Sequence, residues 1–598
     1  KVVKVKQRLE ALRDLMKEHQ IDIYLVPTAD YHNSENVGRY FMERAYISGF
    51  TGSAGSVLVG KDWAGLWTDG RYFLQAEDQL EGSGIDLYRM GEEGVPSLED
   101  FIKDKLVQGG KLAFDGRCIT YGQGLDLQNI VGEKMGSLVY DLDLIDQVWE
   151  DRPPISKEPI FELDIKYTGE SRARKLVRLR SAMEDTGADC HVITSLDDIG
   201  WLLNIRGRDV DYFPLALSYL IVDMDKAVLY IDEEKISGEI MAGLISDGVE
   251  IMPYNAIYED IKLIEKKILL DPDWVNYAIY GNICDKDIII EGQNPTIMMK
   301  TVKNKVEIEN IRQAHIKDGI AHTKYLYWLK KEVEEGRIGN QTEISVSDKL
   351  ESLRRDQEGF ICPSFAPISA FGDHGAIVHY EADGLSDRVL AQGSFLLNDT
   401  GGNYIEGSTD ISRTIVLGLV SQKMKEDYTR VLQAHIRLAR AKFLYGCSGA
   451  NLDILARQPL WDSYLNYNHG TGHGVGYLAN IHEPPISFRW QVGVKPATRL
   501  EEGMVITDEP GLYIGGSHGI RIENELLVRK GPKNDYGQFM YFEALTYCPI
   551  DLDPVLVDML TEDDKAYMND YHQKVYDLIG PGLEEEERRW LREVTRPI

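Results

Sequence analysis

Cysteine is scarce in this chain, and its spacing matches no disulfide or metal-binding motif. The 598 residues contain 6 cysteines, at positions 118, 190, 284, 362, 447 and 548, and no two of them form a Cys-x-x-Cys pair. This scatter argues against a disulfide framework and predicts reduced thiols. Long apolar runs are also missing, since no stretch reaches the roughly 18 residues that a membrane-spanning helix needs.

Positive charge is in short supply as well. The 66 lysines and arginines are outnumbered by 97 aspartates and glutamates, which leaves a net charge of −31. Nucleic acids and anionic membranes attract clustered basic residues, so neither is an expected partner. The first four residues, Lys1 to Lys4, carry no apolar signal-peptide core. The expected location is therefore the cytoplasm.

The length predicts several domains, because a typical domain holds about 100–200 residues. A faint internal repeat supports this: two amphipathic helices, each followed by a strand, share the same spacing of apolar, Arg and Asp positions in 9–22 and 176–189. We predict two similar α/β domains, 1–156 and 157–302, with a linker near Pro153-Pro154. A third domain, 303–547, and a C-terminal extension, 548–598, with helical signals complete the chain.

The third domain carries three islands rich in carboxylate and imidazole side chains. They read Asn398-Asp399-Thr400-Gly401-Gly402 with Ser408-Thr409-Asp410, then His469-Gly470-Thr471-Gly472-His473-Gly474, then Asp508-Glu509-Pro510-Gly511 with Gly519-Ile520-Arg521-Ile522-Glu523-Asn524-Glu525. Five of these side chains form a donor set for two divalent cations with bridging oxygens: Asp399, Asp410, His473, Glu509 and Glu523.

Local patterns place these groups on strands. The apolar run 394–397 predicts a strand, and the β-branched stretch 409–416 predicts its antiparallel return, so that Asp399 and Asp410 face one another. In 520–525 polar and apolar residues alternate, which predicts one strand with Arg521, Glu523 and Glu525 on the same face. Carboxylates gathered inside a sheet repel one another unless cations neutralise them.

Each island alone has a plainer interpretation. Asp-Thr-Gly-Gly and Glu-Pro-Gly usually form turns, and the glycines of 470–476 do not match a dinucleotide-binding fingerprint. His482-Glu483 begins like a zinc-protease helix, but Pro484-Pro485 forbids the helix. Gly515-Gly516-Ser517-His518-Gly519 matches a nucleophile-elbow pattern, but the strand-like residues after it favour a surface turn. No Asp-x-Asp-x-Asp-Gly loop suggests a calcium buffer.

Together the islands resemble the metallopeptidase family with the pita-bread fold. The order Asp, Asp, His, Glu, Glu within NDTGG, STDISRT, HGTGHGVG, TDEPG and GIRIENE carries this resemblance. The stretches 47–55, 67–73, 201–207 and 376–380 narrow it to the long, three-domain aminopeptidase P (Xaa-Pro aminopeptidase) type. The fold class that follows is α/β and α+β, with two tandem similar N-terminal α/β domains before a pita-bread catalytic domain. Asp373-His374, in place of the expected Pro-Asn, and Asn398 are departures.

The resemblance also implies roles for individual residues. Asp410 and Glu523 would bridge two divalent ions, most simply Mn²⁺, with Asp399 on one ion and His473 and Glu509 on the other. The ions would activate a water molecule, and Glu509 would shuttle its proton to the leaving nitrogen. His379 and His482 would steady the oxyanion and the substrate carbonyl, Arg521 would hold ligand carboxylates, and His469 would line a proline pocket. Tyr513 is interpreted as a packing residue.

The implied reaction is release of the N-terminal residue from peptides with proline in second position. A prolidase specific for Xaa-Pro dipeptides is the nearest alternative, although two full N-terminal domains favour the longer-peptide enzyme. A pita-bread protein that has lost catalysis and serves as a binding module is less favoured, because all five ligands are present. The family also implies a homodimer. Aligning the five ligands alone would fit a methionine aminopeptidase or a creatinase equally well.

Overall fold

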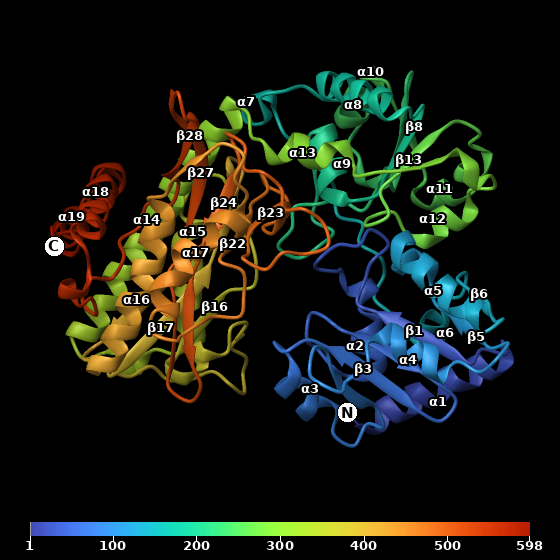
Figure 1. Ribbon diagram of the computed structural model, residues 1–598, viewed down its shortest axis with the longest axis horizontal. Helices are drawn as coiled ribbons and strands as arrows, with labels where there is room; N and C mark the ends of the chain where they lie inside the picture. The colour runs from blue at the N-terminus through green and yellow to red at the C-terminus, as the bar shows by residue number, and fades with distance from the viewer. Residues whose placement is uncertain (1) are drawn as a thin grey trace. The chain divides into compact units, whose positions relative to one another are not determined.

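A computed structural model describes residues 2–598 of the chain (Figure 1). Contacts group these residues into two compact units. One unit comprises residues up to 163 together with 170–296, and the other comprises 164–169 together with 297–598. The limits of the four predicted domains stay a prediction. None of the helices in the described residues has the length and apolar character that a bilayer crossing requires.

The first unit begins with a six-stranded mixed sheet in the order β4-β3-β2-β1-β5-β6. Its strands are β1 (Ile23–Pro27), β2 (Ser56–Val59), β3 (Ala64–Thr68), β4 (Asp86–Arg89), β5 (Lys111–Ala113) and β6 (Ser137–Val139). The accompanying helices are α1 (Val2–Glu18), α2 (Glu43–Ser48), α3 (Phe73–Leu80), α4 (Leu98–Lys105), α5 (Tyr121–Glu133) and α6 (Leu144–Val148). α1 buries Val5, Leu9, Leu12 and Met16, whose spacing of three and four places them on one helical face.

A second six-stranded sheet in the same unit has the order β12-β11-β10-β8-β13-β14. Its strands are β8 (Cys190–Ile193), β10 (Tyr219–Asp223), β11 (Ala227–Tyr230), β12 (Val249–Met252), β13 (Ile268–Leu270) and β14 (Ile289–Glu291). Its helices are α8 (Arg172–Thr186), α9 (Leu196–Leu203), α10 (Gly238–Ser246), α11 (Ile257–Asp260) and α12 (Tyr277–Asn282), and a short pair joins β7 (Phe161–Glu162) to β9 (Ile205–Arg206).

The two sheets repeat one another, as the internal spacing predicts. In each sheet the three middle pairings run antiparallel, antiparallel and parallel, and the outermost pairing on each side is parallel. The repeated arginines also correspond: Arg13 donates from Nε to the Gly60 carbonyl after β2, and Arg180 donates from Nε to the Asp223 carbonyl at the end of β10. The prediction of two similar α/β domains is confirmed.

The second unit contains several smaller sheets and one large one. Its strands are β15 (Phe360–Pro363), β16 (Ile368–Phe371), β17 (Ser394–Thr400), β18 (Gly402–Tyr404), β19 (Gly407–Ser408), β20 (Ile411–Leu417), β21 (Lys442–Leu444), β22 (Gly472–Gly474), β23 (Glu483–Phe488), β24 (Val505–Asp508), β25 (Gly511–Ile514), β26 (His518–Arg521), β27 (Asn524–Asn534) and β28 (Gly537–Ala544). The orders are β15-β18-β19, β16-β17-β20, β25-β26 and β21-β28-β27-β24-β22-β23.

Long helices accompany these strands (Figure 1): α14 (Lys305–Glu334), α15 (Glu343–Arg355), α16 (Gln422–Ala439) and α17 (Gly449–Trp461). Asn304 caps α14 in a reciprocal capping box with Glu307. α13 (Pro295–Thr301) leads the chain into this unit. α7 (Ile165–Thr168) belongs to it too: the Asn304 amide donates to the Thr168 carbonyl, although the chain on either side of α7 lies in the first unit.

The C-terminal extension is helical, as predicted, with α18 (Glu562–Ile579) and α19 (Glu585–Val594). Glu584 and Glu587 form a capping box at the start of α19, where acidic residues favour the helix dipole. Both helices contact α14, and Met568, Val575 and Leu591 join the large apolar core beneath the big sheet.

One strand prediction is wrong. Residues 519–525 do not form a single strand: β26 ends at Arg521, β27 begins at Asn524, and the chain changes partners in between, from β25 to β24. At the change the Glu523 amide donates to the Ser412 carbonyl at 3.1 Å. The alternation nevertheless survives, because Ile520 and Ile522 remain in the apolar core. A second difference is that the connection between β17 and β20 contains the extra pair β18–β19.

Candidate metal centre

Three carboxylates meet where β17, β20 and the start of β27 converge. β17 and β20 are antiparallel, with Asp399 opposite Ser412, and Asp410 directly precedes β20. Glu523 reaches the same place through a bridge to Ser412, whose hydroxyl donates to Glu523 Oε1 at 2.8 Å. One oxygen from each of Asp399, Asp410 and Glu523 lies within 4.8 Å of the others. The two islands thus supply one buried cluster.

His473 and Glu509 complete the cluster from neighbouring strands of the large sheet. His473 lies in β22, and Glu509 follows β24, with its amide donating to the Thr471 carbonyl at 2.7 Å. The glycines around His473 have a steric reason: a Cβ on Gly472 would lie 1.8 Å from the Thr507 carbonyl oxygen. Only glycine allows the strands to approach this closely. One ligand atom from each of His473, Glu509 and Glu523 again lies within 4.8 Å of the others.

The hydrogen bonds of His473 fix its tautomer. Nδ1 lies 2.8 Å from the Gly474 carbonyl oxygen, which can only accept, so Nδ1 carries the proton. Nε2 faces the carboxylates at 3.3 Å from both Asp410 Oδ2 and Glu509 Oε1. Metal-binding histidines in proteins commonly donate their outer N–H to a carbonyl in this way, leaving the other nitrogen for the metal.

Without cations, two carboxyl groups of the cluster have raised pKa values, because their negative charges are buried close together. Burial raises the pKa of Asp399 to about 7, with Arg521 opposing the rise and the Asp410 and Glu509 charges adding to it. Burial and the same neighbouring carboxylates hold the pKa of Glu523 well above its ordinary value. Divalent cations would remove this repulsion and keep both groups ionised.

His473 and Glu509 show the complementary pattern. Burial lowers the pKa of His473, but hydrogen bonds to Asp410 and Glu509 outweigh it, and the net shift is strongly upward. Burial opposes ionisation of Glu509, yet its bond to His473 and the nearby positive charge lower its pKa to about 2. These shifts favour a positive charge on His473 and a negative charge on Glu509.

The donor set also has unused capacity. Within residues 2–598, the buried oxygens Asp399 Oδ1 and Glu523 Oε2 accept no hydrogen bond. Buried carboxylate oxygens are normally satisfied, and leaving one unpaired is costly. Four carboxylates and one imidazole around such oxygens suit two hard or borderline divalent cations. The residues therefore fit a dinuclear metal site.

Arg521 lies beside the cluster and links it to two further side chains. Its Nε and Nη2 donate to Asp399 Oδ2 at 2.9 and 2.7 Å, and its Nη1 donates to the Tyr513 hydroxyl at 2.8 Å. Tyr513 in turn lies 2.7 Å from His469 Nε2. His469 Nδ1 faces the Gly470 carbonyl at 2.8 Å and must donate, so Nε2 accepts the tyrosine proton. Burial lowers the pKa of His469 to about 4, which keeps this imidazole neutral.

The remaining candidate histidines are more exposed. His482 packs edge-on against His473, with ring centroids 4.4 Å apart, and shares a group of closely spaced ligand atoms with Asp410 and His473. The residues after His482 form strand β23, so the proline pair does exclude the zinc-protease helix. His379 is exposed and follows the short helix Gly372–Ala376. The structure thus brings the five predicted ligands, His469, His482 and Arg521 into one region, while His379 lies on a neighbouring loop.

The unexpected pair Asp373-His374 builds a polar anchor for that loop. His374 Nδ1 lies 2.9 Å from Glu343 Oε2, and its Nε2 lies 2.9 Å from Arg388 Nη2. Asp373 pairs with Arg388, and the His374 ring stacks on Tyr380 at 4.3 Å. Tyr380 also donates to Glu343, so the residue beside His379 is tied to the start of α15. This departure acts on the loop and leaves the five predicted ligands unchanged.

Sequence reasoning undervalued two residues. Tyr513, interpreted as packing, joins Arg521 to His469, and its position two residues after Glu-Pro-Gly was the available signal. Glu525 accepts the Asp410 amide at 2.9 Å and lies 2.7 Å from His315 Nε2, which holds the backbone of a predicted ligand. Its alternation with Glu523 pointed to the site, but its partner His315 lies 210 residues away in α14.

Comparison with known families covers nearly the whole chain. The metallopeptidase family M24 matches residues 309–530, and the C-terminal region of peptidase M24 matches 538–598. Creatinase/prolidase N-terminal domains match residues 8–148 and 151–307. The class defined by fold and site is thus a metallopeptidase with two creatinase-type domains, as the sequence predicts.

The chain belongs to metallopeptidase family M24, and its full-length relatives define the branch. It is 39% identical to aminopeptidase P2 of Arabidopsis thaliana, covering 100% of this chain and 89% of the relative. It is 36% identical to Xaa-Pro aminopeptidase 1 of Dictyostelium discoideum, covering 100% and 97%.

Solved structures give the same picture. The crystal structure of X-prolyl aminopeptidase from Caenorhabditis elegans, described as a cytosolic enzyme with a di-nuclear active site, is 34% identical, with a TM-score of 0.93 over 99% of this chain and 100% of that one. The Xaa-Pro dipeptidase from Bacillus anthracis is 27% identical with a TM-score of 0.50, and covers 64% of this chain.

Proposed function

We propose that this protein is a metal-dependent Xaa-Pro aminopeptidase, which releases the N-terminal residue from peptides with proline in second position. The observation that carries the proposal is the buried cluster of Asp399, Asp410, His473, Glu509 and Glu523 in a chain that aligns end to end with Xaa-Pro aminopeptidases. Hydrolysis is the chemistry that such a donor set supports.

Two divalent cations per chain are part of the proposal. Asp410 and Glu523 would bridge them, Asp399 would bind one, and His473 and Glu509 would bind the other. When bound, the cations would supply Lewis acidity, lowering the pKa of a coordinated water and polarising the scissile carbonyl. We take Mn²⁺ as the native metal by analogy with the family, although the donor set also suits Co²⁺, Zn²⁺ and Fe²⁺.

The protein's own groups have separate tasks around that centre. Glu509 is proposed to take a proton from water and pass it to the leaving nitrogen, because its carboxylate lies beside the proposed metal site. Arg521 opposes the effect of burial on Asp399 through two hydrogen bonds to Oδ2, and so favours the ionised form of this carboxyl group. His482, next to His473, and His379 are proposed to stabilise the developing oxyanion and the substrate carbonyl.

Recognition of proline is assigned to the group around His469. The Xaa-Pro bond has no N–H, so a proline-specific enzyme must recognise the ring by shape instead of by that hydrogen bond. Both nitrogens of His469 are already engaged, by Gly470 and Tyr513, so the imidazole presents its ring face or edge to a substrate. A held, neutral ring of this kind suits contact with an apolar pyrrolidine.

A prolidase is the second candidate, and the extent of similarity disfavours it. The Bacillus anthracis dipeptidase matches 64% of this chain, whereas the long aminopeptidases match all or nearly all of it. Incubation with Xaa-Pro and Xaa-Pro-Yaa peptides after chelation and metal return separates the two. Release of the first residue from the tripeptide supports the proposal, while cleavage of the dipeptide alone would overturn it. An Asp410→Asn variant serves as the inactive control.

Further expectations accompany the proposal. By analogy with the cytosolic enzyme of Caenorhabditis elegans we propose a cytoplasmic protein that acts on peptides, with no role for nucleic acid or a membrane surface. The family resemblance suggests in addition that it is a homodimer. The predicted domain limits at 156, 302 and 547 belong to the same proposal. Size-exclusion chromatography with light scattering tests the dimer, and a monomer at micromolar concentration would refute it.

A further inference from the structure

Arg413 is a buried cation on the opposite side of β20 from the metal cluster. Its neighbour Ser412 directs its hydroxyl to Glu523, and adjacent residues of a strand point to opposite faces. The Arg413 side chain is 2% exposed. Within the described chain its five N–H groups face six neutral acceptors, three of which share the two hydrogens of Nη2: the carbonyls of Ser412, Glu523, Cys548 and Pro549, the Asn524 side-chain oxygen and the Tyr571 hydroxyl. The position of a buried guanidinium is tightly fixed, because each N–H that loses its acceptor lowers the stability of the fold.

The acceptors of Arg413 come from two parts of the chain. On one side, Nη1 donates to the Ser412 and Glu523 carbonyls at 3.0 and 2.8 Å. Ser412 and Glu523 form the β-bridge that positions the Glu523 carboxylate. On the other side, Cys548, Pro549 and Tyr571 belong to the C-terminal extension. Arg413 therefore connects the extension to the backbone of a proposed metal ligand.

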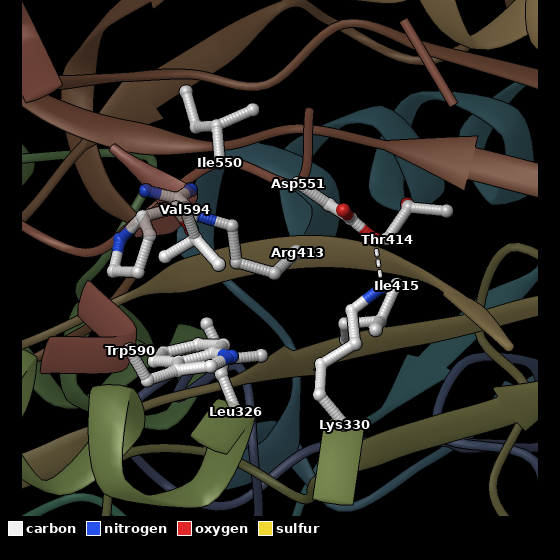
Figure 2. A pocket seen from close by; sticks show the side chains of 10 residues that line it. Leu326, Lys330, Arg413, Thr414, Ile415, Ile550, Asp551, Trp590 and Val594 are labelled. Carbon is white, nitrogen blue, oxygen red and sulfur yellow. Dashed lines mark hydrogen bonds and ion pairs between the residues drawn. The ribbon is translucent and has the colours of Figure 1, made fainter. Parts of the chain in front are cut away.

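The C-terminal extension also contacts β20 at Val416. Asp551 accepts the Val416 amide at 2.9 Å and pairs with Lys330 of α14 at 2.8 Å, while Lys330 donates to the Val416 carbonyl at 3.0 Å. Figure 2 shows Arg413, Lys330 and Asp551 with Trp590 of α19 around one small cavity. Its volume is about 20 Å³, room for little more than one water molecule.

We propose that the C-terminal extension is a functional part of the metal centre's frame, and that it sets metal affinity by holding Arg413 and, through Arg413, the backbone of Glu523. Arg413 and Tyr571 are positioning residues in this scheme. Outer partners that orient a ligand commonly change metal affinity by about 10–100-fold when removed. The inference rests on the proposed dinuclear site.

The decisive substitution is Tyr571→Phe in the full chain. It keeps the aromatic ring in the core and removes the hydroxyl, which accepts from Arg413 at 3.1 Å and from the Cys548 amide at 3.3 Å, and whose single proton lies within reach of the Thr546 and Cys548 carbonyls. Arg413→Lys keeps the charge but cannot reach acceptors on both sides. Tyr567→Phe is the matched control: Tyr567 lies one turn earlier in α18, stacks on Tyr571, and within residues 2–598 makes no hydrogen bond to Arg413.

Two measurements on each protein test the inference: Mn²⁺ titration of chelated protein by calorimetry, and the free energy of unfolding of the metal-free form. We expect Mn²⁺ affinity to fall about tenfold in Tyr571→Phe and about 10–100-fold in Arg413→Lys, and to stay within twofold in Tyr567→Phe. If Arg413→Lys does not fold, Tyr571→Phe decides alone.

The outcomes separate this inference from the proposed function. Loss of stability in Tyr571→Phe with unchanged Mn²⁺ affinity means that the hydroxyl is only structural, and the inference is overturned. Weaker Mn²⁺ binding in Tyr571→Phe, with Tyr567→Phe unchanged, supports it. Failure of the unsubstituted protein to bind Mn²⁺, Co²⁺ or Zn²⁺ would refute the proposed function itself.

Discussion

Replacing Tyr513 by phenylalanine isolates the hydroxyl that joins Arg521 to His469. In the intact protein the Arg521 Nη1 donates to this hydroxyl at 2.8 Å, and the hydroxyl donates to His469 Nε2. Burial raises the pKa of Tyr513 to about 12, with Arg521 opposing, so the hydroxyl keeps its proton at neutral pH. The substitution therefore leaves one buried cationic donor and one buried imidazole acceptor unpaired while the ring remains.

The size of the effect follows from these two contacts. A hydrogen bond to a charged group contributes about 1.5–3 kcal/mol and a neutral one about 1 kcal/mol. A combined loss of about 3 kcal/mol, felt in the transition state, corresponds to about a 150-fold fall in kcat/KM. We expect a decrease of at least about tenfold, because part of the loss is relieved by local rearrangement.

The assay is kcat/KM for an Xaa-Pro-Yaa peptide with saturating metal, together with metal content and thermal stability. Tyr445→Phe is the control, since Tyr445 makes a comparable hydrogen bond to Glu501 on the exposed surface of the same unit. A kcat/KM for Tyr513→Phe within twofold of the parent protein, with normal metal content, would refute the assigned link between Arg521 and His469.

Three further outcomes follow from the geometry. Gly472→Ala should lower the free energy of unfolding by about 3 kcal/mol in chemical denaturation, because its Cβ would lie 1.8 Å from the Thr507 carbonyl oxygen. Gly515→Ala is the control, because a Cβ at residue 515 meets no atom within 4 Å and should change the free energy of unfolding little. Equal stability of the two variants would contradict the steric argument. Metal saturation at 100 times Kd should stabilise the chelated protein by about 2.7 kcal/mol per site, and no shift in unfolding would argue against cation binding by the cluster. Burial lowers the pKa of His572 to about 3. As the pH falls below about 6.5, therefore, only the unfolded state takes up a proton on this side chain, and the free energy of unfolding decreases by about 2 kcal/mol between pH 7.5 and 5. His572→Gln should remove that part of the pH dependence in urea unfolding, and parallel curves for the two proteins would exclude it.

Much of the site was predictable because its residues lie in short patterned segments. The five predicted ligands lie in motifs whose glycines indicate close backbone approach, and the structure gathers one candidate ligand atom from each into overlapping groups. The similarity of the two N-terminal sheets was also predictable, because the repeated Arg13 and Arg180 positions reflect the same contact to the sheet.

What the sequence could not reveal depends on partners far apart in the chain. The break between β26 and β27 lies at the bridge from Glu523 to Ser412, 111 residues earlier. The alternation of polar and apolar residues in 520–525 does not indicate this partner. The role of Tyr513 likewise depends on where Arg521 and His469 fold. The link from Arg413 to the C-terminal extension joins residues 135 or more apart through backbone carbonyls, which have no side-chain signature.

The small helix α7 has a practical consequence for dissecting this protein. Asn304 and Asn310, at the start of α14, donate their amides to the carbonyls of Thr168, Lys166 and Tyr167. A fragment beginning at residue 303 would carry every proposed ligand yet lose the six-residue segment 164–169 that belongs to its own fold. A separately expressed peptidase unit should therefore include residues 164–169, although domain limits drawn from the sequence leave them out.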